Sequence, residues 1–473
     1  MYFSSLLFLF VFLPIVLAVY YIVPRKFRNA FLLLANLVFY GWGEPVFILI
    51  MIVSVVSNYI FGLLIEKYRD NQKRKKTFLV LSLVISLGLL AVFKYTGFVT
   101  DILRAIPPFS FMPKINLPLP IGISFYTFQT LSYTIDVYRG DTKAQKSLVS
   151  FGTYVSFFPQ LIAGPIVRYS DVENQIARRN ENIDDIANGF RRFIVGLSKK
   201  IFVVGLAKKV LIANQMGVLW DTIRGTSSNG IVGAWIGIIS YAFQIYFDFS
   251  GYSDMACGLG KMFGFEFMKN FNYPYVSKTI TEFWRRWHIS LSSWFRDYVY
   301  IPLGGNRCKL PRVIFNLFAV WALTGLWHGA NFNFIAWGIY YFVILVLEKY
   351  VYGKYLEKLP SLPKHIYALL LILLGWTIFY FEDFGQFAAY LKSMFTLKNG
   401  IIGGDTLSTI LMYLPILIVT AMASLPIWKN TYLKLKDKKY MGVLEIAFCA
   451  VVIVLCTASL VNQSYNPFLY FRF

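Results

Sequence analysis

The sequence predicts an all-α integral membrane protein, and three observations support this prediction. Hydrophobic residues make up 57% of the 473 residues and charged residues only 15%, against about 25% charged in soluble domains. Apolar runs recur along the chain, and a run of about 20 residues is long enough to cross the hydrocarbon of a bilayer as a helix. The net charge of +22 gathers in short basic loops between these runs, as is typical of cytoplasmic loops. Because backbone groups in lipid must be satisfied within their own segment, the spans are predicted to be helices.

Ten apolar runs are the clearest predicted spans. They are Phe3–Val23, Val46–Ile65, Phe78–Phe93, Leu119–Val137, Gly230–Phe249, Val313–Trp327, Phe334–Leu347, His365–Phe381, Leu407–Leu425 and Met441–Val461. Phe31–Tyr40 is a shorter run that stops at a breaker cluster, and Ile201–Leu219 is an apolar run that carries two lysines. With these two the chain has eleven to twelve crossings. No internal repeat or linker is visible, so we predict one integral membrane domain over residues 1–473.

Two further stretches do not resemble simple spans. Ser150–Pro165 is apolar but contains Pro159 and a Gly-Pro pair, which favours a re-entrant or broken helix. Thr279–Leu303 is predicted to be an amphipathic helix, because aromatic and leucine side chains recur on one face at helical spacing. Non-helical backbone at membrane depth is tolerated only where it is buried in protein or lines a cavity. We therefore expect an internal cavity.

Several classes of function are excluded by the sequence. The chain has no G-x-S-x-G elbow, no H-E-x-x-H and no P-loop, so it is not a serine hydrolase, a zincin or an ATPase. Its four cysteines form no CxxC pair, and we expect them to be free, with no metal site. Topology and anionic lipid explain the basic loops, and nucleic acid is not an expected partner because no soluble basic domain is present.

His328 is the strongest candidate for chemistry. It lies 15 residues into the predicted span that begins at Val313, roughly 22 Å along a helix. Ionisable groups at that depth are costly and indicate function, and histidine suits general-base work on a hydroxyl. Gly325 and Gly329 beside it are expected to let a substrate approach closely. The alternative is a histidine held by a neighbouring carbonyl in a helix packing seam.

Four other ionisable residues leave alternatives open. His288 lies beside the aromatic stripe of the amphipathic stretch, where a site residue and a plain aromatic-belt helix with snorkelling arginines are both reasonable. Asp297 would pair with an arginine or orient a histidine. Asp248, in an apolar run, needs a partner, and a structural ion pair or helix-end hydrogen bond is favoured over participation in a reaction. His365 is expected to cap a helix at the interface.

At these residues the sequence resembles the membrane-bound O-acyltransferase (MBOAT) family, and within it the bacterial AlgI-like branch of alginate O-acetyltransferases. Five blocks carry the resemblance. They are Leu119–Gly140, Phe157–Asp171, Gln244–Phe265, Asn272–Arg307 and the segment TGLWHGAN at Thr324–Asn331. Together they are specific and cover most of the chain, and the last 100 residues are the least distinctive.

The resemblance implies a helical bundle around a central tunnel that opens to both sides of the membrane. It also implies that His328, in its Trp-His-Gly triplet, is the central catalytic histidine and that His288 belongs to the active site. Weaker candidates for supporting the site or binding substrate are Asn331, Trp327, Trp284, Arg286, Asp297 and Asp248. A side chain such as His288 or the Asn331 amide, or backbone donors, would stabilise the oxyanion.

The expected reaction moves an acetyl group across the cytoplasmic membrane of a bacterium. The donor is acetyl-CoA or an acylated carrier, with no bound cofactor. The resemblance implies that the acceptor is a hydroxyl of an exocellular or cell-wall polysaccharide, reached directly or through an exported SGNH-type partner protein. Two alternatives remain open from the sequence: D-alanylation of teichoic acid from a carrier-protein thioester, and a transporter or polysaccharide export pore in which the deep histidine relays protons.

Overall fold

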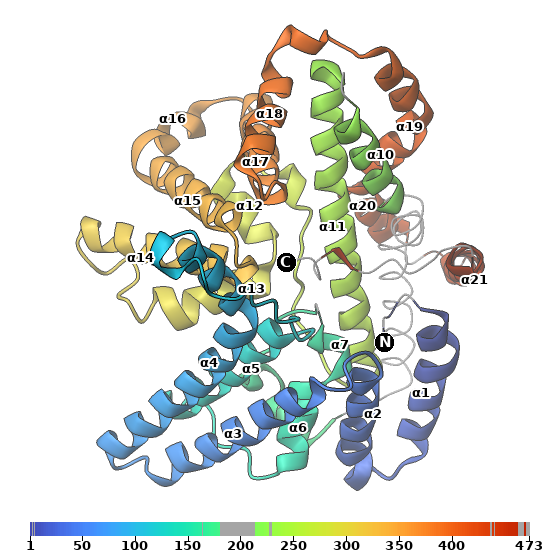
Figure 1. Ribbon diagram of the computed structural model, residues 1–473. Coiled ribbons are helices and arrows are strands. Elements are labelled where there is room, and N and C mark those ends of the chain that lie inside the picture. The colour runs from blue at the N-terminus through green and yellow to red at the C-terminus, as the bar shows by residue number, and fades with distance from the viewer. Residues whose placement is uncertain are drawn as a thin grey trace. The chain divides into compact units, whose positions relative to one another are not determined.

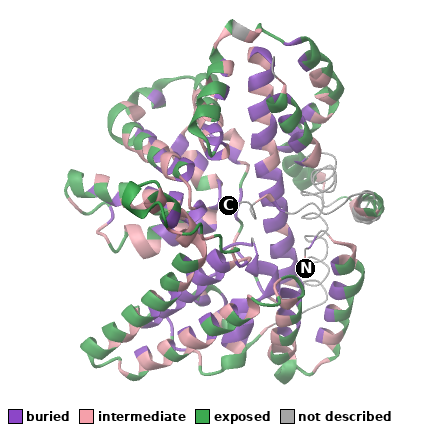
Figure 2. Cartoon of the chain, viewed as in Figure 1, coloured by how far each residue is buried: buried purple, intermediate pink, exposed green. Residues whose placement is uncertain are grey.

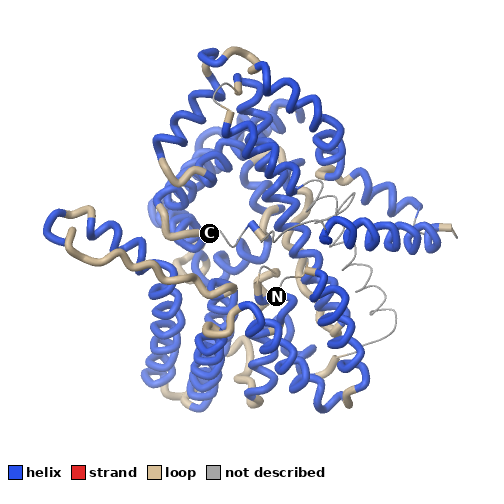
Figure 3. Tube along the Cα trace, turned by 45° about the vertical axis from the view of Figure 1, so that its right-hand side comes forward, coloured by secondary structure: helices blue, strands red, loops and turns tan. Residues whose placement is uncertain are grey.

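The computed structural model describes residues 5–162, 164–179, 213–226, 229–435, 440–461 and 468–469, together with residues 1, 3 and 438. Within these ranges the chain forms helices and loops and no strand (Figures 1 and 3). This confirms the all-α prediction. The chain, for which the sequence predicts a single domain, divides into two compact units: Met1–Phe190 with Ala256–Met268, and Arg191–Met255 with Lys269–Phe473.

The first unit is built mainly from the N-terminal helices. Its elements are η1 (Phe8–Phe12), α1 (Leu13–Ile22), η2 (Arg25–Phe27), α2 (Arg28–Gly43), α3 (Ile48–Lys67), α4 (Gln72–Arg104), η3 (Pro107–Phe109), α5 (Ile123–Arg139), α6 (Leu148–Ser156), α7 (Phe158–Leu161) and α8 (Tyr169–Ala177). α3 and α4 pack against α5, whose side chains are almost all buried. The outer faces of α3 and α4 are apolar and exposed (Figure 2), as expected of surfaces that contact lipid.

The predicted break in Ser150–Pro165 is confirmed between α6 and α7. Phe157 interrupts the helix, and Asn36 of α2 satisfies backbone groups at the interruption. Its amide nitrogen donates to the Thr153 carbonyl at 3.5 Å, and its amide oxygen accepts from the Phe158 N–H at 3.2 Å. A buried amide thus replaces the hydrogen bonds that the break removes, which allows irregular backbone inside the protein.

The second unit contains a long central helix and the C-terminal half of the chain. Its elements are α10 (Asn214–Gly225), α11 (Gly230–Met262), η5 (Pro274–Val276), α12 (Ile280–Arg286), α13 (Ile289–Phe295), η6 (Arg296–Tyr300), α14 (Leu310–His328), α15 (Phe332–Leu347), η7 (Glu348–Tyr352), α16 (Gly353–Lys358), α17 (Ser361–Tyr380), α18 (Phe384–Phe395), η8 (Leu397–Asn399), α19 (Gly404–Ala423), α20 (Ile427–Leu435) and α21 (Met441–Val461). The last turns of α11, from Ala256, belong to the first unit.

Seven helices in the described ranges are long and apolar enough to cross a membrane, which confirms a multi-pass membrane protein. They are Ile48–Lys67, Gln72–Arg104, Gly230–Met262, Leu310–His328, Phe332–Lys358, Ser361–Tyr380 and Gly404–Ala423. The number is lower than the eleven to twelve crossings predicted. Phe8–Ile22 is a shorter apolar helix, α5 has 17 residues and a polar, buried surface, and residues 201–212 of one predicted span lie outside the described ranges.

The prediction of one amphipathic helix over Thr279–Leu303 was wrong. The stretch forms α12, α13 and the π-helix η6, with a break between Arg286 and Ile289. At the break, His288 has a φ of 45°, in the left-handed region, which cannot continue a right-handed helix. The helical spacing of the aromatic residues is real within each piece, but the extended backbone at Trp287 and the left-handed backbone at His288 redirect the chain between them.

Candidate active site

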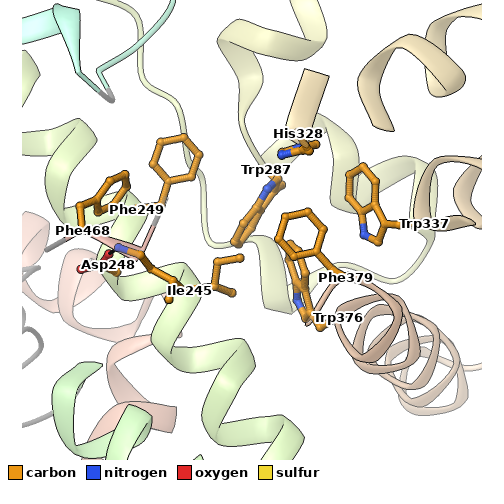
Figure 4. A pocket seen from close by; sticks show the side chains of 10 residues that line it. Ile245, Asp248, Phe249, Trp287, His328, Trp337, Trp376, Phe379 and Phe468 are labelled. Atoms are coloured by element: carbon orange, nitrogen blue, oxygen red, sulfur yellow. Dashed lines mark hydrogen bonds between the residues drawn. The ribbon is translucent and has the colours of Figure 1, made fainter. Parts of the chain in front are cut away.

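Both His328 and Asp248 line a small cavity within the second unit (Figure 4). Its volume is about 20 Å³, room for about one water molecule. His328 and Asp248 supply its ionisable groups; in Figure 4 Asp248 lies at the left of the view and His328 near the top. The remaining lining residues are Ile245, Phe249, Trp287, Trp337, Trp376, Phe379, Phe468 and Leu469. A base in such apolar surroundings acts with little competition from water.

His328 is the last residue of α14 and is 7% exposed. Its imidazole packs edge-on against Trp337 and Phe379, with ring centroids 4.9 and 5.2 Å apart. Phe379 is itself held by Asn333, whose amide donates to the Phe379 carbonyl at 2.8 Å. Two helices that follow α14 in the chain, α15 and α17, therefore fix the position of the ring.

The glycines around His328 serve helix packing, which corrects the expectation that they admit a substrate. A methyl group at Gly325 would clash with the carbonyl oxygen of Phe334, and one at Gly329 would clash with the Phe334 ring. Across the same seam, a methyl group at Gly338 would lie 2.5 Å from the Trp321 carbonyl oxygen. These residues let α14 and α15 approach closely, and that approach places Trp337 against His328.

Asp248 lies in the interior of α11 and accepts a hydrogen bond from a segment far away in the sequence. Its side chain is 4% exposed and accepts a hydrogen bond from the Leu469 N–H at 2.8 Å. The adjacent Phe468 ring packs against Phe249 and Tyr252, with centroids 5.8 and 5.2 Å apart. Asp248 thus holds a segment near the C-terminus against the cavity.

His288 does not line the cavity but packs against residues beside it. Its ring lies 4.7 Å from Phe249 and 5.9 Å from Trp327. The left-handed backbone at His288 is fixed on both sides by the segment that follows α11. Asn272 donates its N–H to the Arg286 carbonyl at 2.9 Å, and Ile289 donates to the Asn270 carbonyl at 3.0 Å.

The electrostatics of His288 follow from its burial. The residue is 1% exposed, and neither ring nitrogen has a hydrogen-bond partner among the described residues. Burial lowers the pKa of His288 to about 3, because a charged imidazolium loses its hydration there. His288 is therefore neutral at physiological pH, with one N–H available to donate and one nitrogen available to accept.

Of the weaker candidates, Asp248 lines the cavity, and Trp327, Trp284, Arg286, Asp297 and Asn331 do not. Trp327 is 3% exposed, and its ring lies 5.9 Å from the His288 ring and 5.1 Å from the His328 ring. Trp284 packs on Trp321 and on Trp337, the latter a cavity residue.

Arg286 and Asp297 are engaged by other residues. Arg286 pairs with Glu282 at 2.8 Å and donates to the Asn272 carbonyl. Asp297 pairs with Arg296 at 2.6 Å, which is the arginine-pairing alternative of the sequence analysis. Asn331 is the N-cap residue of α15 and is partly exposed. His365 contacts the Ser277 carbonyl at 3.2 Å through Nδ1.

Most of the cavity wall was not identified as a site from the sequence. Trp376, Phe379 and Trp337 lie on predicted spans, where an aromatic residue is ordinary core. Trp287 is one of the aromatic residues that recur at helical spacing in Thr279–Leu303, a pattern that does not by itself indicate a site. The single available signal was the position of Trp287 next to His288.

In the described ranges no group of three or more His, Cys, Asp or Glu side chains is arranged to hold a metal ion. Cys257 and Cys308 form no disulfide in the part of the chain that the structure describes. The side chains of the other two cysteines lie outside what the structure describes.

Comparison with known proteins identifies the family. Residues 142–358 match the family model of MBOAT, the membrane-bound O-acyltransferase family. The chain is 44% identical over 386 residues to the probable alginate O-acetylase AlgI of Pseudomonas aeruginosa, covering 81% of this chain and 72% of that protein. The chain belongs to the membrane-bound O-acyltransferase family.

The chain is also similar to two other acyltransferases. The peptidoglycan O-acetyltransferase of Helicobacter pylori is 34% identical over 435 residues, which is 84% of this chain and 80% of that protein. The teichoic acid D-alanyltransferase of Bacillus subtilis is more distant, 29% identical over 285 residues, which is 58% of this chain and 69% of that protein. This MBOAT protein is thus a multi-pass membrane O-acyltransferase, and the alternative of a transporter without chemistry is set aside.

Proposed function

We propose that this enzyme moves an acetyl group from a cytoplasmic thioester, acetyl-CoA or an acylated carrier, onto a hydroxyl across the cytoplasmic membrane of a bacterium. The acetyl group goes to an exocellular or cell-wall polysaccharide, through an exported SGNH-type partner protein. The observation that carries the proposal is His328 in a buried, aromatic cavity, in a chain 44% identical to a probable alginate O-acetylase.

In the proposed reaction His328 acts as the general base. Its imidazole takes the proton of the acceptor hydroxyl while the hydroxyl oxygen attacks the thioester carbonyl. The carbon–sulfur bond then breaks, and the departing thiolate takes the proton from the imidazolium. Because His328 lies at the C-terminal end of α14, the partial negative charge of that helix end stabilises the imidazolium in between.

His288 is proposed to support the site as a neutral hydrogen-bonding group rather than as a second base. Its low pKa keeps it uncharged, and neither ring nitrogen is engaged by a described residue. A neutral imidazole N–H is a suitable donor to a developing oxyanion. Because Phe249 and Trp327 cover its ring, these side chains would have to move for substrate to reach it.

The D-alanyl alternative uses the same base and differs in the donor. It is supported by more distant relatives, such as the teichoic acid D-alanyltransferase of Bacillus subtilis at 29% identity, so we favour acetyl transfer. A genomic neighbour encoding an SGNH-type protein supports acetylation, and one encoding a D-alanyl carrier supports the alternative.

The test compares cell-surface polymers from a strain lacking the gene, complemented with the wild type or with His328→Ala. Mass spectrometry measures acetyl and D-alanyl groups on the polymers, and membrane fractions verify the amount of protein. We expect the wild type to restore acetylation and His328→Ala to restore none at equal expression. Normal acetylation in the variant would remove His328 from the mechanism, and restored D-alanylation would replace the proposed donor.

A further inference from the structure

A second hollow, distinct from the cavity at His328, lies in the first unit beside the loop that joins α1 to α2 (dark blue in Figure 1). Its volume is about 340 Å³, and five of its eight lining residues are cationic. The lining residues are Arg25, Lys26, Arg28, Asn29, Ile176, Ala177, Arg178 and Arg179. No carboxylate is among these eight lining residues, so the lining itself is strongly basic.

Two arginines of the hollow are held in place by a common aromatic ring. The guanidinium of Arg28 lies 4.9 Å from the centre of the Tyr20 ring, and that of Arg179 lies 5.8 Å from it. Arg179 also stacks on Phe265 at 4.8 Å. A guanidinium fixed by stacking keeps its fork of N–H donors in one orientation, which favours bidentate recognition of phosphate.

Asn29 links the two sides of the hollow. Its amide nitrogen donates to the Ile176 carbonyl at 3.1 Å and to the Ser150 hydroxyl at 3.2 Å. Its amide oxygen accepts from the Arg179 guanidinium. The start of α2 and the end of α8 are thereby joined, so the basic residues converge on a built hollow rather than on a flexible loop.

The surroundings of the hollow are apolar and face outward. It follows directly on the apolar helix Phe8–Ile22, where Ile22 is 80% exposed, and Phe27 beside it is 57% exposed. Exposed apolar side chains beside a cluster of cations are typical of a membrane surface. The concentration of Arg and Lys further indicates the cytoplasmic side. A ligand that uses both features has an anionic head and an apolar tail.

We propose that this hollow binds the phosphate of an anionic phospholipid from the cytoplasmic leaflet. The headgroup phosphate contacts Arg28 and Arg179, and the acyl chains lie along the exposed surface near Ile22 and Phe27. This site is independent of the proposed acetyl transfer and of the residues that line the His328 cavity.

The test measures lipid retained by the purified full-length protein. The protein is reconstituted in nanodiscs of phosphatidylcholine with phosphatidylglycerol, released into detergent, and analysed by native mass spectrometry. The variant is Arg28→Gln with Arg179→Gln. The matched control, Arg69→Gln with Arg74→Gln, removes the same charge from the loop between α3 and α4 and from the first turn of α4. Thermal unfolding verifies that both variants are folded, and Arg28→Lys with Arg179→Lys keeps the charge if the Gln variant does not fold.

We expect the wild type and the control to retain phosphatidylglycerol in preference to phosphatidylcholine. Retention in the Gln variant should fall about 10- to 30-fold, since each basic residue near an anionic surface contributes about 1 kcal/mol. Equal retention in wild type and Gln variant would overturn the proposal. It would also be overturned if soluble ADP bound the wild type and displaced the lipid, because the hollow would then recognise a soluble phosphate.

Discussion

The carboxylate of Glu348 accepts hydrogen bonds from both the backbone N–H, at 2.7 Å, and the hydroxyl of Thr281. It also accepts from the Ile280 N–H at 2.8 Å, and it is only 6% exposed. One side chain of η7 therefore satisfies the first turn of α12, the helix that leads to Trp287 in the cavity wall and to His288. Neither the sequence spacing of 67 residues nor any motif indicated this contact.

Replacing Glu348 should destabilise the first turn of α12, the helix that leads to Trp287 and His288. In Glu348→Gln one carboxylate oxygen becomes an NH₂ group that faces N–H donors. We expect the free energy of unfolding to fall by about 1–3 kcal/mol, the usual cost of an unsatisfied buried polar group, and acetyl transfer to fall with it. Thermal unfolding and turnover measure the two effects. Glu357→Gln, an exposed glutamate of α16, is the control, and a Glu348 variant indistinguishable from it would contradict the role.

Two substitutions at His288 can separate the chemical role of its ring from the effect of its left-handed backbone on stability. With a φ of 45°, the position suits Asn better than Ala, because Asn tolerates this region more readily. We expect His288→Asn to be more stable than His288→Ala by about 1 kcal/mol, while both lose most acetyl transfer. Unfolding curves and turnover of the two variants are the measurements. Full turnover in His288→Asn would show that the imidazole is dispensable.

His288 also predicts a pH dependence of stability. Its pKa is about 3 in the folded protein against an ordinary value of 6.5, so between these values the unfolded state binds more protons. Stability therefore rises with pH across this window, and falls as the pH drops from about 6.5 towards about 3. In His288→Asn this contribution is absent. The change in unfolding midpoint between about pH 7 and about pH 4.5 should be smaller in the variant than in the wild type. The same change in both proteins would show that His288 does not contribute to the pH dependence of stability.

The parts of the fold that the sequence predicted are those set by local composition. Apolar length locates α3, α11 and α17, and Pro159 marks the α6–α7 break, because these features depend on the segment itself. His328 was identifiable for the same reason: an ionisable residue in an apolar run needs an explanation wherever the run packs.

The cavity wall was not predictable because it depends on which helices meet. Phe379 and Phe468 become site residues only through contacts with α14 and α11, far away in the sequence. The break at His288 was missed because helical spacing of the aromatic residues continues across it, whereas the left-handed backbone is imposed by the pairing with Asn270 and Asn272.

The close approach of α14 and α15 predicts opposite effects for two glycine substitutions. A methyl group at Gly325 would clash with the Phe334 carbonyl, whereas one at Gly88 of α4 meets no atom within 4 Å. We expect Gly325→Ala to destabilise the protein by about 1–3 kcal/mol through overpacking and to reduce transfer by displacing His328. Gly88→Ala should be neutral or stabilising by up to about 1 kcal/mol. Thermal unfolding of both variants tests this prediction, and equal unfolding midpoints would refute the packing argument.

The size of the cavity predicts how acyl-chain length is selected. About 20 Å³ of space lies beside His328, and Phe468, only 3% exposed, closes one side of it. In Phe468→Ala the missing ring leaves room for additional methylene groups. Given the proposed acetyl donor, we expect the rate of propionyl relative to acetyl transfer to rise about tenfold, the discrimination that one methylene group typically provides.

Competition between propionyl and acetyl thioesters, with both products quantified by mass spectrometry, measures this ratio. Phe111→Ala removes a phenyl group that is 82% exposed in the first unit and should leave the ratio unchanged. An unchanged ratio in Phe468→Ala, with the protein folded and active, would mean that the acyl chain does not enter this cavity. The transfer would then occur on another face of His328, and Phe468 would serve only to hold the C-terminal segment that Asp248 binds.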